Sequence, residues 1–150
     1  MSITQIPSGS DRLGVTADIT KLTPADVFDY WTKPELLCTW WPQEAEIDAR
    51  VGGEYHLSWP RMNWHLRGRY THFETGKQIA FTWKWDHDEE GTTVREVTID
   101  LESLPYHGTR LMLTHGPYTN SAEDQAVRIE HHLAGWQHFI PRLQQVAETA

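Results

Sequence analysis

Hydrophobic and polar residues alternate with a period of two over residues 13–20 and again over most of residues 44–115. Such alternation is typical of strands that bury one face and expose the other. The first stretch predicts a strand, and six further strands are expected over residues 44–48, 54–59, 64–71, 79–85, 97–101 and 111–115. Because most of them carry one apolar and one charged face, they predict an antiparallel meander that is covered on one side only.

Helical signals flank this meander. Thr23 is expected to cap a helix that starts at Pro24, and a break at Lys33-Pro34 divides this region into two short helices. A longer helix is expected after Ser121, since apolar residues recur there at helical spacing. These residues are Val127, Leu133, Trp136, Ile140, Leu143 and Ala147. Pro141 removes one backbone hydrogen bond of that helix and predicts a kink near Gln137.

The order of elements predicts an α+β fold of the helix-grip type. One strand, two short helices, six antiparallel strands and a final helix form a β-α-α-β-β-β-β-β-β-α series. A sheet with one apolar face needs a cover, so we expect it to curve around the C-terminal helix and leave a cavity between them. The 150 residues suit a single domain, with residues 1–11 as a polar, aperiodic lead-in.

Eight tryptophans are the unusual feature of the composition. Tryptophan is large and needs a partner for its N–H group, so an excess favours a roomy interior or a binding surface. The alternation places several aromatic residues on the inner face, as candidate contacts for an apolar ligand. These candidates are Tyr55, Trp59, Trp64, Tyr70, Trp83 and Trp85, with Trp136 on the helix. A plain aromatic core is the alternative interpretation.

His115 is the polar residue that the pattern places on the same inner face, at the end of the last strand. An imidazole in an aromatic cavity is a candidate catalytic acid or base, or an anchor for the polar end of a ligand. The alternative is a structural histidine bonded to a nearby carbonyl. The sequence identifies no partner that would complete a catalytic set.

Charge and cysteine content narrow the classes of partner. A formal net charge of −8 disfavours nucleic acids and anionic membrane surfaces. Cys38 is the only cysteine and no secretory leader is recognisable, which favours a cytoplasmic location. His131 and His138 lie two helical turns apart, too far to share one zinc ion. No phosphate-binding loop or dinucleotide fingerprint is recognisable, so neither a metal nor a cofactor is expected.

Five segments, in this order, carry a resemblance to a known family. They are VFDYWTKPELLCTWW, EIDARVGGEY, RGRYTHFE with QIAFTWKW, TRLMLTHGPY and HHLAGWQHFIPRL. Together they resemble the START-like superfamily, and within it stand-alone proteins similar to the C-terminal domain of the activator of heat-shock protein 90 ATPase. The resemblance covers roughly residues 24–146. It implies the helix-grip fold and a hydrophobic cavity, and the wider superfamily includes lipid carriers, hormone receptors and polyketide cyclases.

Three functional hypotheses follow from these observations. The first is a non-enzymatic module that binds a small apolar or aromatic ligand between sheet and helix. The second is a cyclase-like enzyme that uses His115, with Tyr55 or Tyr70, as acid and base groups. The third is a protein-interaction module with a chaperone partner, for which the segment Trp40-Trp41-Pro42 is the candidate surface. A homodimer is left open by the sequence.

Overall fold

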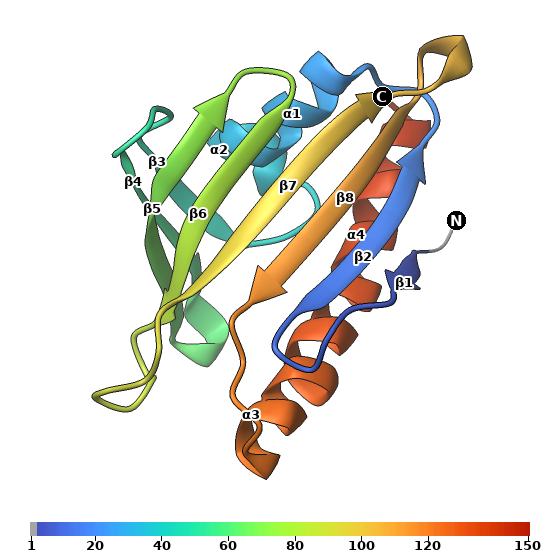
Figure 1. The fold of residues 1–150 in the computed structure, drawn as a ribbon. Helices are drawn as coiled ribbons and strands as arrows, with labels where there is room; N and C mark the ends of the chain where they lie inside the picture. The colour runs from blue at the N-terminus through green and yellow to red at the C-terminus, as the bar shows by residue number, and fades with distance from the viewer. Residues whose placement is uncertain (1–2) are drawn as a thin grey trace.

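An antiparallel sheet of eight strands curves in front of a long C-terminal helix in the computed structural model, which describes residues 3–150 (Figure 1). The spatial order is β1-β2-β8-β7-β6-β5-β4-β3, so the second and the last strands are neighbours. In chain order the strands are β1 (Thr4–Ile6), β2 (Leu13–Ile19), β3 (Glu44–Ile47), β4 (Glu54–Trp59), β5 (Trp64–Glu74), β6 (Gln78–Trp85), β7 (Arg95–Ser103) and β8 (Thr109–Gly116). The helix-grip arrangement expected from the alternation is confirmed.

The helices lie at the ends and behind the sheet (Figure 1). They are α1 (Pro24–Thr32), α2 (Pro34–Leu37), α3 (Ala122–Ala126) and α4 (Ala134–Glu148), with the short 3-10 turns η1 (Pro60–Met62) and η2 (Pro105–His107). A π-helical segment, η3 (Val127–Leu133), joins α3 to α4. Thr23 caps α1 as predicted: its side chain accepts from the N–H of Asp26, and the Asp26 carboxylate accepts from the N–H of Thr23.

One expectation about the chain ends is wrong in detail. Residues Thr4–Ile6, within the predicted lead-in, form β1 and pair with β2, because Ile6 finds an antiparallel partner in Gly14. Pro141 lies within the last helix, and the kink expected near Gln137 stays a prediction. Helix α4 continues through Pro141, and the departure from α-helical geometry is the π-helical segment η3 before it. A π-helical turn needs an inserted residue, which helical periodicity alone does not reveal.

The apolar face of the sheet packs on α4. Leu13, Val15, Leu111 and Leu113 are fully buried on β2 and β8, and they meet the helix side that carries Ile140. The face predicted for these strands is therefore confirmed. Gln144 adds a polar tie, because its side-chain amide donates to the carbonyl of Asp18 at 2.8 Å.

Tyr55 covers Gly68 on the neighbouring strand β5, two residues before a register shift at Tyr70 to His72. The Tyr55 hydroxyl donates to the carbonyl of Thr82 at 2.6 Å, while the Thr82 hydroxyl accepts from the N–H of Arg69 at 2.9 Å. These two side chains satisfy the backbone groups of β5 and β6 at this point. An aromatic ring over a glycine is a known way to support a bent strand, and only glycine leaves room for it.

Gly68→Ala is expected to lower the free energy of unfolding by about 2–3 kcal/mol, the cost of overpacking a closed site. A Cβ atom there would lie 2.0 Å from the Thr82 carbonyl oxygen and 2.5 Å from the Tyr55 ring. Urea unfolding measures the change. Gly135→Ala is the control, since a Cβ at Gly135 in α4 meets no atom within 4 Å and alanine is the better helix former. Equal stability of the two variants would contradict the argument.

Candidate functional site

Six tryptophans from five segments of the chain form one buried cluster behind the sheet. Trp41 lies at its centre, with its ring centroid 5.2 Å from that of Trp136 and 5.9 Å from those of Trp31 and Trp83. The remaining members are Trp40 and Trp59. All six are at most 7% exposed. We call this set the tryptophan cluster.

The position of Trp41 overturns one prediction. The segment Trp40-Trp41-Pro42 was expected as an exposed interaction surface, but all three residues are buried. The turn after α2 directs both indoles inward, and the N–H of Trp40 donates to the carbonyl of Tyr30 at 3.0 Å. A protein-interaction module thus loses the residues that suggested it.

His115 is completely buried at the edge of this cluster. Its Nδ1 accepts a hydrogen bond from the indole N–H of Trp136 at 3.2 Å. Because an indole nitrogen can only donate, Nδ1 must carry the lone pair, and the proton of the neutral ring is on Nε2. Burial holds the pKa of His115 well below its usual value, with His132 and Arg95 acting in the same direction. His115 is therefore neutral and presents an N–H donor.

A second histidine stacks on the first. The rings of His115 and His132 are 4.2 Å apart and nearly parallel, at 10°. Nδ1 of His132 lies 2.7 Å from the hydroxyl of Tyr118. Burial, followed by the charge of Arg95, lowers the pKa of His132 to about 3. His132 belongs to the π-helical segment η3, and π-helical turns occur frequently at functional sites.

A partly buried ion pair closes this side of the cluster. Arg95 at the start of β7 donates to Asp124 in α3 at 2.8 Å, and the two side chains are 7% and 21% exposed. The guanidinium also lies over the ring of Tyr118, 4.8 Å from its centroid. Asp124 accepts a second hydrogen bond from the N–H of Thr119. The Arg95–Asp124 pair thus ties the last helix to the sheet beside the two histidines.

Three buried polar atoms near this site have no hydrogen-bond partner within residues 3–150. They are Nε1 of Trp31, Nε1 of Trp83 and Nε2 of His115. All three are donors, given the tautomer of His115. The rings of Trp83 and His115 are neighbours, with centroids 4.6 Å apart. Buried donors are nearly always paired in proteins, so unpaired ones mark a place where an acceptor can bind.

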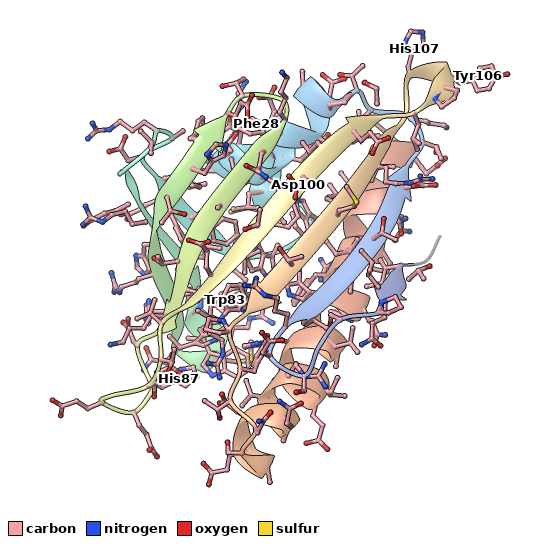
Figure 2. All side chains as sticks on the ribbon, in the orientation of Figure 1. Phe28, Trp83, His87, Asp100, Tyr106 and His107 are labelled. Carbon is pink, nitrogen blue, oxygen red and sulfur yellow. The ribbon has the colours of Figure 1, made fainter. Side chains whose placement is uncertain are left out.

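Aromatic rings lead from this site to the surface. Trp83 contacts Trp85 at 5.7 Å, and Trp85 contacts Trp64 at 5.9 Å. Trp64 is 43% exposed, so its predicted place on the inner wall is wrong: it begins β5 directly after the left-handed Asn63, outside the enclosed part of the sheet. Trp85 is half-buried. Figure 2 shows Trp83 and His87 toward the same end of the molecule, where β6 ends.

Tyr55 and Tyr70 are buried as predicted but belong to a different group of rings. They lie 5.9 Å apart, and Phe81 packs against both of them. The Tyr55 hydroxyl donates its hydrogen bond to the carbonyl of Thr82. Burial raises the pKa of both tyrosines well above the usual value. They pack where β4, β5 and β6 meet, and they are poorly suited to exchange protons at neutral pH.

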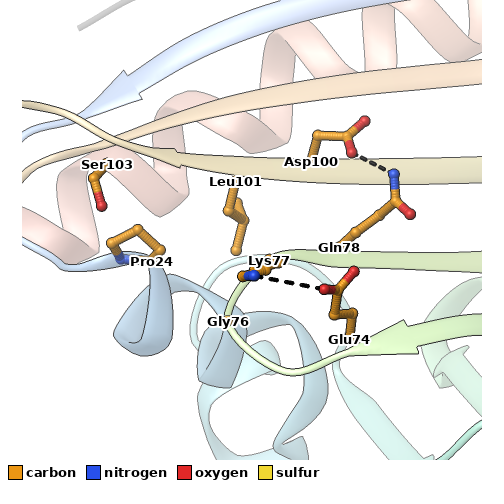
Figure 3. Close-up of a pocket in the computed structure, with 8 residues that line it drawn as sticks. All are labelled: Pro24, Glu74, Gly76, Lys77, Gln78, Asp100, Leu101 and Ser103. Carbon is orange, nitrogen blue, oxygen red and sulfur yellow. Dashed lines mark hydrogen bonds and ion pairs between the residues drawn. The ribbon is translucent and has the colours of Figure 1, made fainter.

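Two surface hollows lie apart from the tryptophan cluster. Figure 3 shows one of about 460 Å³ beside the β5–β6 turn, where Lys77 pairs with Glu74 and Gln78 bonds to Asp100. The other, about 860 Å³, runs over β3, β4, β5 and β6, and within it Arg69 pairs with Glu54 at 2.7 Å. Both are polar, and neither includes a residue of the tryptophan cluster.

Other candidate chemistries receive little support. Within the described part of the chain, no group of three or more histidine, cysteine or acidic residues could hold a metal ion. Burial, with Glu44 and Glu35, raises the pKa of the Cys38 thiol, which disfavours a reactive thiolate. No helix within residues 3–150 is long and apolar enough to cross a membrane.

The alternation and the helical spacing together located only part of this site. They found Trp59, Trp83, Trp136 and His115, which the structure brings together. They missed Trp41, Tyr118 and His132. Trp41 and Tyr118 lie in connecting segments without periodicity, and His132 lies in the π-helical segment η3. The helical stripe of apolar residues skips His132, so no sequence signal marked it.

Comparison with known proteins agrees with this architecture. The family model described as Activator of Hsp90 ATPase homolog 1-like protein matches residues 21–148. The chain belongs to this family. No curated protein sequence matches the chain. This match confirms the family that the five sequence segments suggested.

Solved structures share the fold of the family at low sequence identity. A protein from Rhodobacter sphaeroides is 23% identical, with 98% of each chain covered and a TM-score of 0.80. An HSP90 activator from Plasmodium falciparum is 22% identical over 90% of this chain and 94% of its own, with a TM-score of 0.71. The Aha1 dimer from Colwellia psychrerythraea is 17% identical, covers 91% and 96%, and gives a TM-score of 0.76. At these identities the likeness concerns the fold.

Proposed function

We propose that this protein binds a small aromatic or other apolar molecule between the sheet and α4, at the tryptophan cluster, without catalysing a reaction. The observation that carries the proposal is the pair of unpaired N–H donors on Trp83 and His115 inside an aromatic interior. Sites for small molecules are mostly apolar with a few placed polar groups, which is the composition found here.

Rings of the protein fill the cluster, so a ligand enters only if aromatic side chains move. The series Trp64, Trp85 and Trp83 gives a route from the exposed end of β5 to His115. The segment η3 faces the same site and carries His132. A ligand ring that takes the place of one indole restores the aromatic contacts of the neighbouring rings, which favours the exchange.

The state of His115 argues against the cyclase-like alternative. A general base needs a free lone pair, and the lone pair of His115 accepts from Trp136. Protonation is disfavoured by burial, so His115 is also a poor acid at neutral pH. His115 can still donate one hydrogen bond from Nε2, and such a bond would orient a ligand.

Tryptophan fluorescence tests the proposal. Titration with naphthalene-sized aromatic compounds is expected to quench emission saturably and to raise the melting temperature as ligand concentration exceeds Kd. The control is Trp64→Phe, which removes the most exposed indole. The quenching should persist in this variant because the interior indoles report binding. Quenching that disappears with Trp64, or a complete lack of saturable binding across the series, would refute an interior site.

A partner-binding role is a second proposal, supported by the neighbours named as an HSP90 activator and as an Aha1 dimer. Its surface would have to lie outside Trp40-Trp41-Pro42, since those residues are buried. Co-purification with a chaperone tests chaperone binding. Light scattering, which gives the mass in solution, tests dimerisation. A cytoplasmic location stays a prediction from the single cysteine.

A further inference from the structure

We propose that the ligand of the tryptophan cluster carries a neutral carbonyl oxygen, which accepts hydrogen bonds from Nε1 of Trp83 and Nε2 of His115. The inference rests on the proposed binding function and adds the chemical class of the ligand. It would be an aromatic ketone, quinone or amide rather than a hydrocarbon or a carboxylate.

The requirement for an acceptor follows from the two donors. The indole N–H of Trp83 can only donate, and the bond from Trp136 to Nδ1 leaves His115 a donor as well. Trp83 is 7% exposed and His115 is 0% exposed, and their nitrogens have no partner among the described residues. A carbonyl oxygen has two lone pairs and can accept from both neighbouring rings. A hydrocarbon would leave both donors unpaired, which is unfavourable.

The requirement for neutrality follows from the nearby charges. Arg95, whose positive charge acts on both histidines, is already paired with Asp124 at 2.8 Å. A protonated His115 would direct an N–H group at the N–H of Trp136, so it cannot supply a compensating charge. A buried carboxylate would therefore lack a counter-charge and lose its hydration. A neutral ketone, quinone or amide does not carry the desolvation cost of a buried charge.

The aromatic body of the ligand follows from the surrounding rings. Trp41 and Trp136 lie on the inner side of Trp83, at 5.9 and 5.7 Å between centroids. These ring faces and edges suit a flat, rigid partner, because offset and edge-to-face contacts between aromatic rings are favourable. The carbonyl group would then lie at the His115 end of the cluster and the ring system among the indoles.

Three naphthalenes of similar size test the inference: 2-acetylnaphthalene, 2-isopropylnaphthalene and 2-naphthoate. Their dissociation constants are measured by calorimetry on the wild type, Trp83→Phe and His115→Phe. Trp83→Phe removes one donor and keeps a ring, so it should weaken the ketone about tenfold and leave the hydrocarbon nearly unchanged. His115→Phe removes the other donor but also frees the N–H of Trp136, so the loss of ketone affinity should be smaller there. Comparing the two ligands across variants cancels their different solubility in water. Trp59→Phe is the matched control, a buried indole outside the donor pair, and should affect both ligands equally.

The outcomes separate this inference from the proposed function. If both neutral compounds bind and lose affinity equally in Trp83→Phe, the carbonyl inference is wrong while the binding function stands. If naphthoate binds more tightly than the ketone, neutrality is wrong. If none of the three binds, the binding function itself fails. The infrared carbonyl stretch of bound 2-acetylnaphthalene is a check that needs no variant: it should fall below its value in hydrocarbon solvent, and an unshifted band would refute the hydrogen bonds.

Discussion

Acidification from pH 7 to pH 5 is expected to reduce the free energy of unfolding by about 2 kcal/mol through His132 alone, and His115 adds a loss in the same direction. The pKa of His132 is about 3 in the folded protein, against a usual value of 6.5, because burial and the charge of Arg95 disfavour the imidazolium. Burial likewise places the pKa of His115 well below 6.5.

The direction of this effect follows from proton binding. Below pH 6.5 the unfolded chain takes up a proton on each histidine that the folded protein does not bind. The stability contributed by the two neutral rings is therefore present above pH 6.5 and is lost as the pH falls toward about 3, where His132 protonates in the folded state.

Urea unfolding at pH 7, 6 and 5 measures the loss in the wild type, His132→Phe and His115→Phe. Each variant should show a shallower dependence on pH than the wild type, whatever its stability at pH 7. His138→Gln corrects for the loss of a histidine elsewhere in the last helix, where the side chain is exposed. Parallel pH curves for the wild type and both phenylalanine variants would show that other groups cause the acid sensitivity.

Arg95→Met is expected to lower the free energy of unfolding by about 1–3 kcal/mol, because it leaves the partly exposed Asp124 carboxylate without its counter-charge. Asp124 would keep the N–H of Thr119 but lose the guanidinium at 2.8 Å. In the wild type, burial raises the pKa of Asp124, yet the Thr119 bonds and Arg95 outweigh it and the net pKa is lowered. The variant should therefore also raise the Asp124 pKa, measurable by NMR titration.

Arg110→Met is the matched control for this result. Arg110 pairs with Asp18 through Nε at 3.0 Å, but both side chains are nearly half exposed. Water screens such a pair, so its removal should change stability little. A loss as large for Arg110→Met as for Arg95→Met would mean that burial does not explain the effect.

Individual residues show how much of the site could be predicted from the sequence. His115 follows the alternation of β8, and its predicted inward direction is confirmed because strand parity continues to the end of that strand. Trp64 obeys the same parity and is nevertheless exposed, since it opens β5 beyond the covered part of the sheet. Trp41 was expected outside and is the centre of the cluster, because no periodicity describes the turn after α2.

The sequence by itself determined the elements, their faces and the helix-grip order, because alternation and helical spacing are local properties that each segment carries alone. Only the tertiary structure decided which rings meet. The Trp136–His115 bond joins residues 21 positions apart, and the Arg95–Asp124 pair joins residues 29 apart. The tautomer of His115, the neutrality of His132 and the two unpaired donors all depend on such contacts and on burial, which no local pattern specifies.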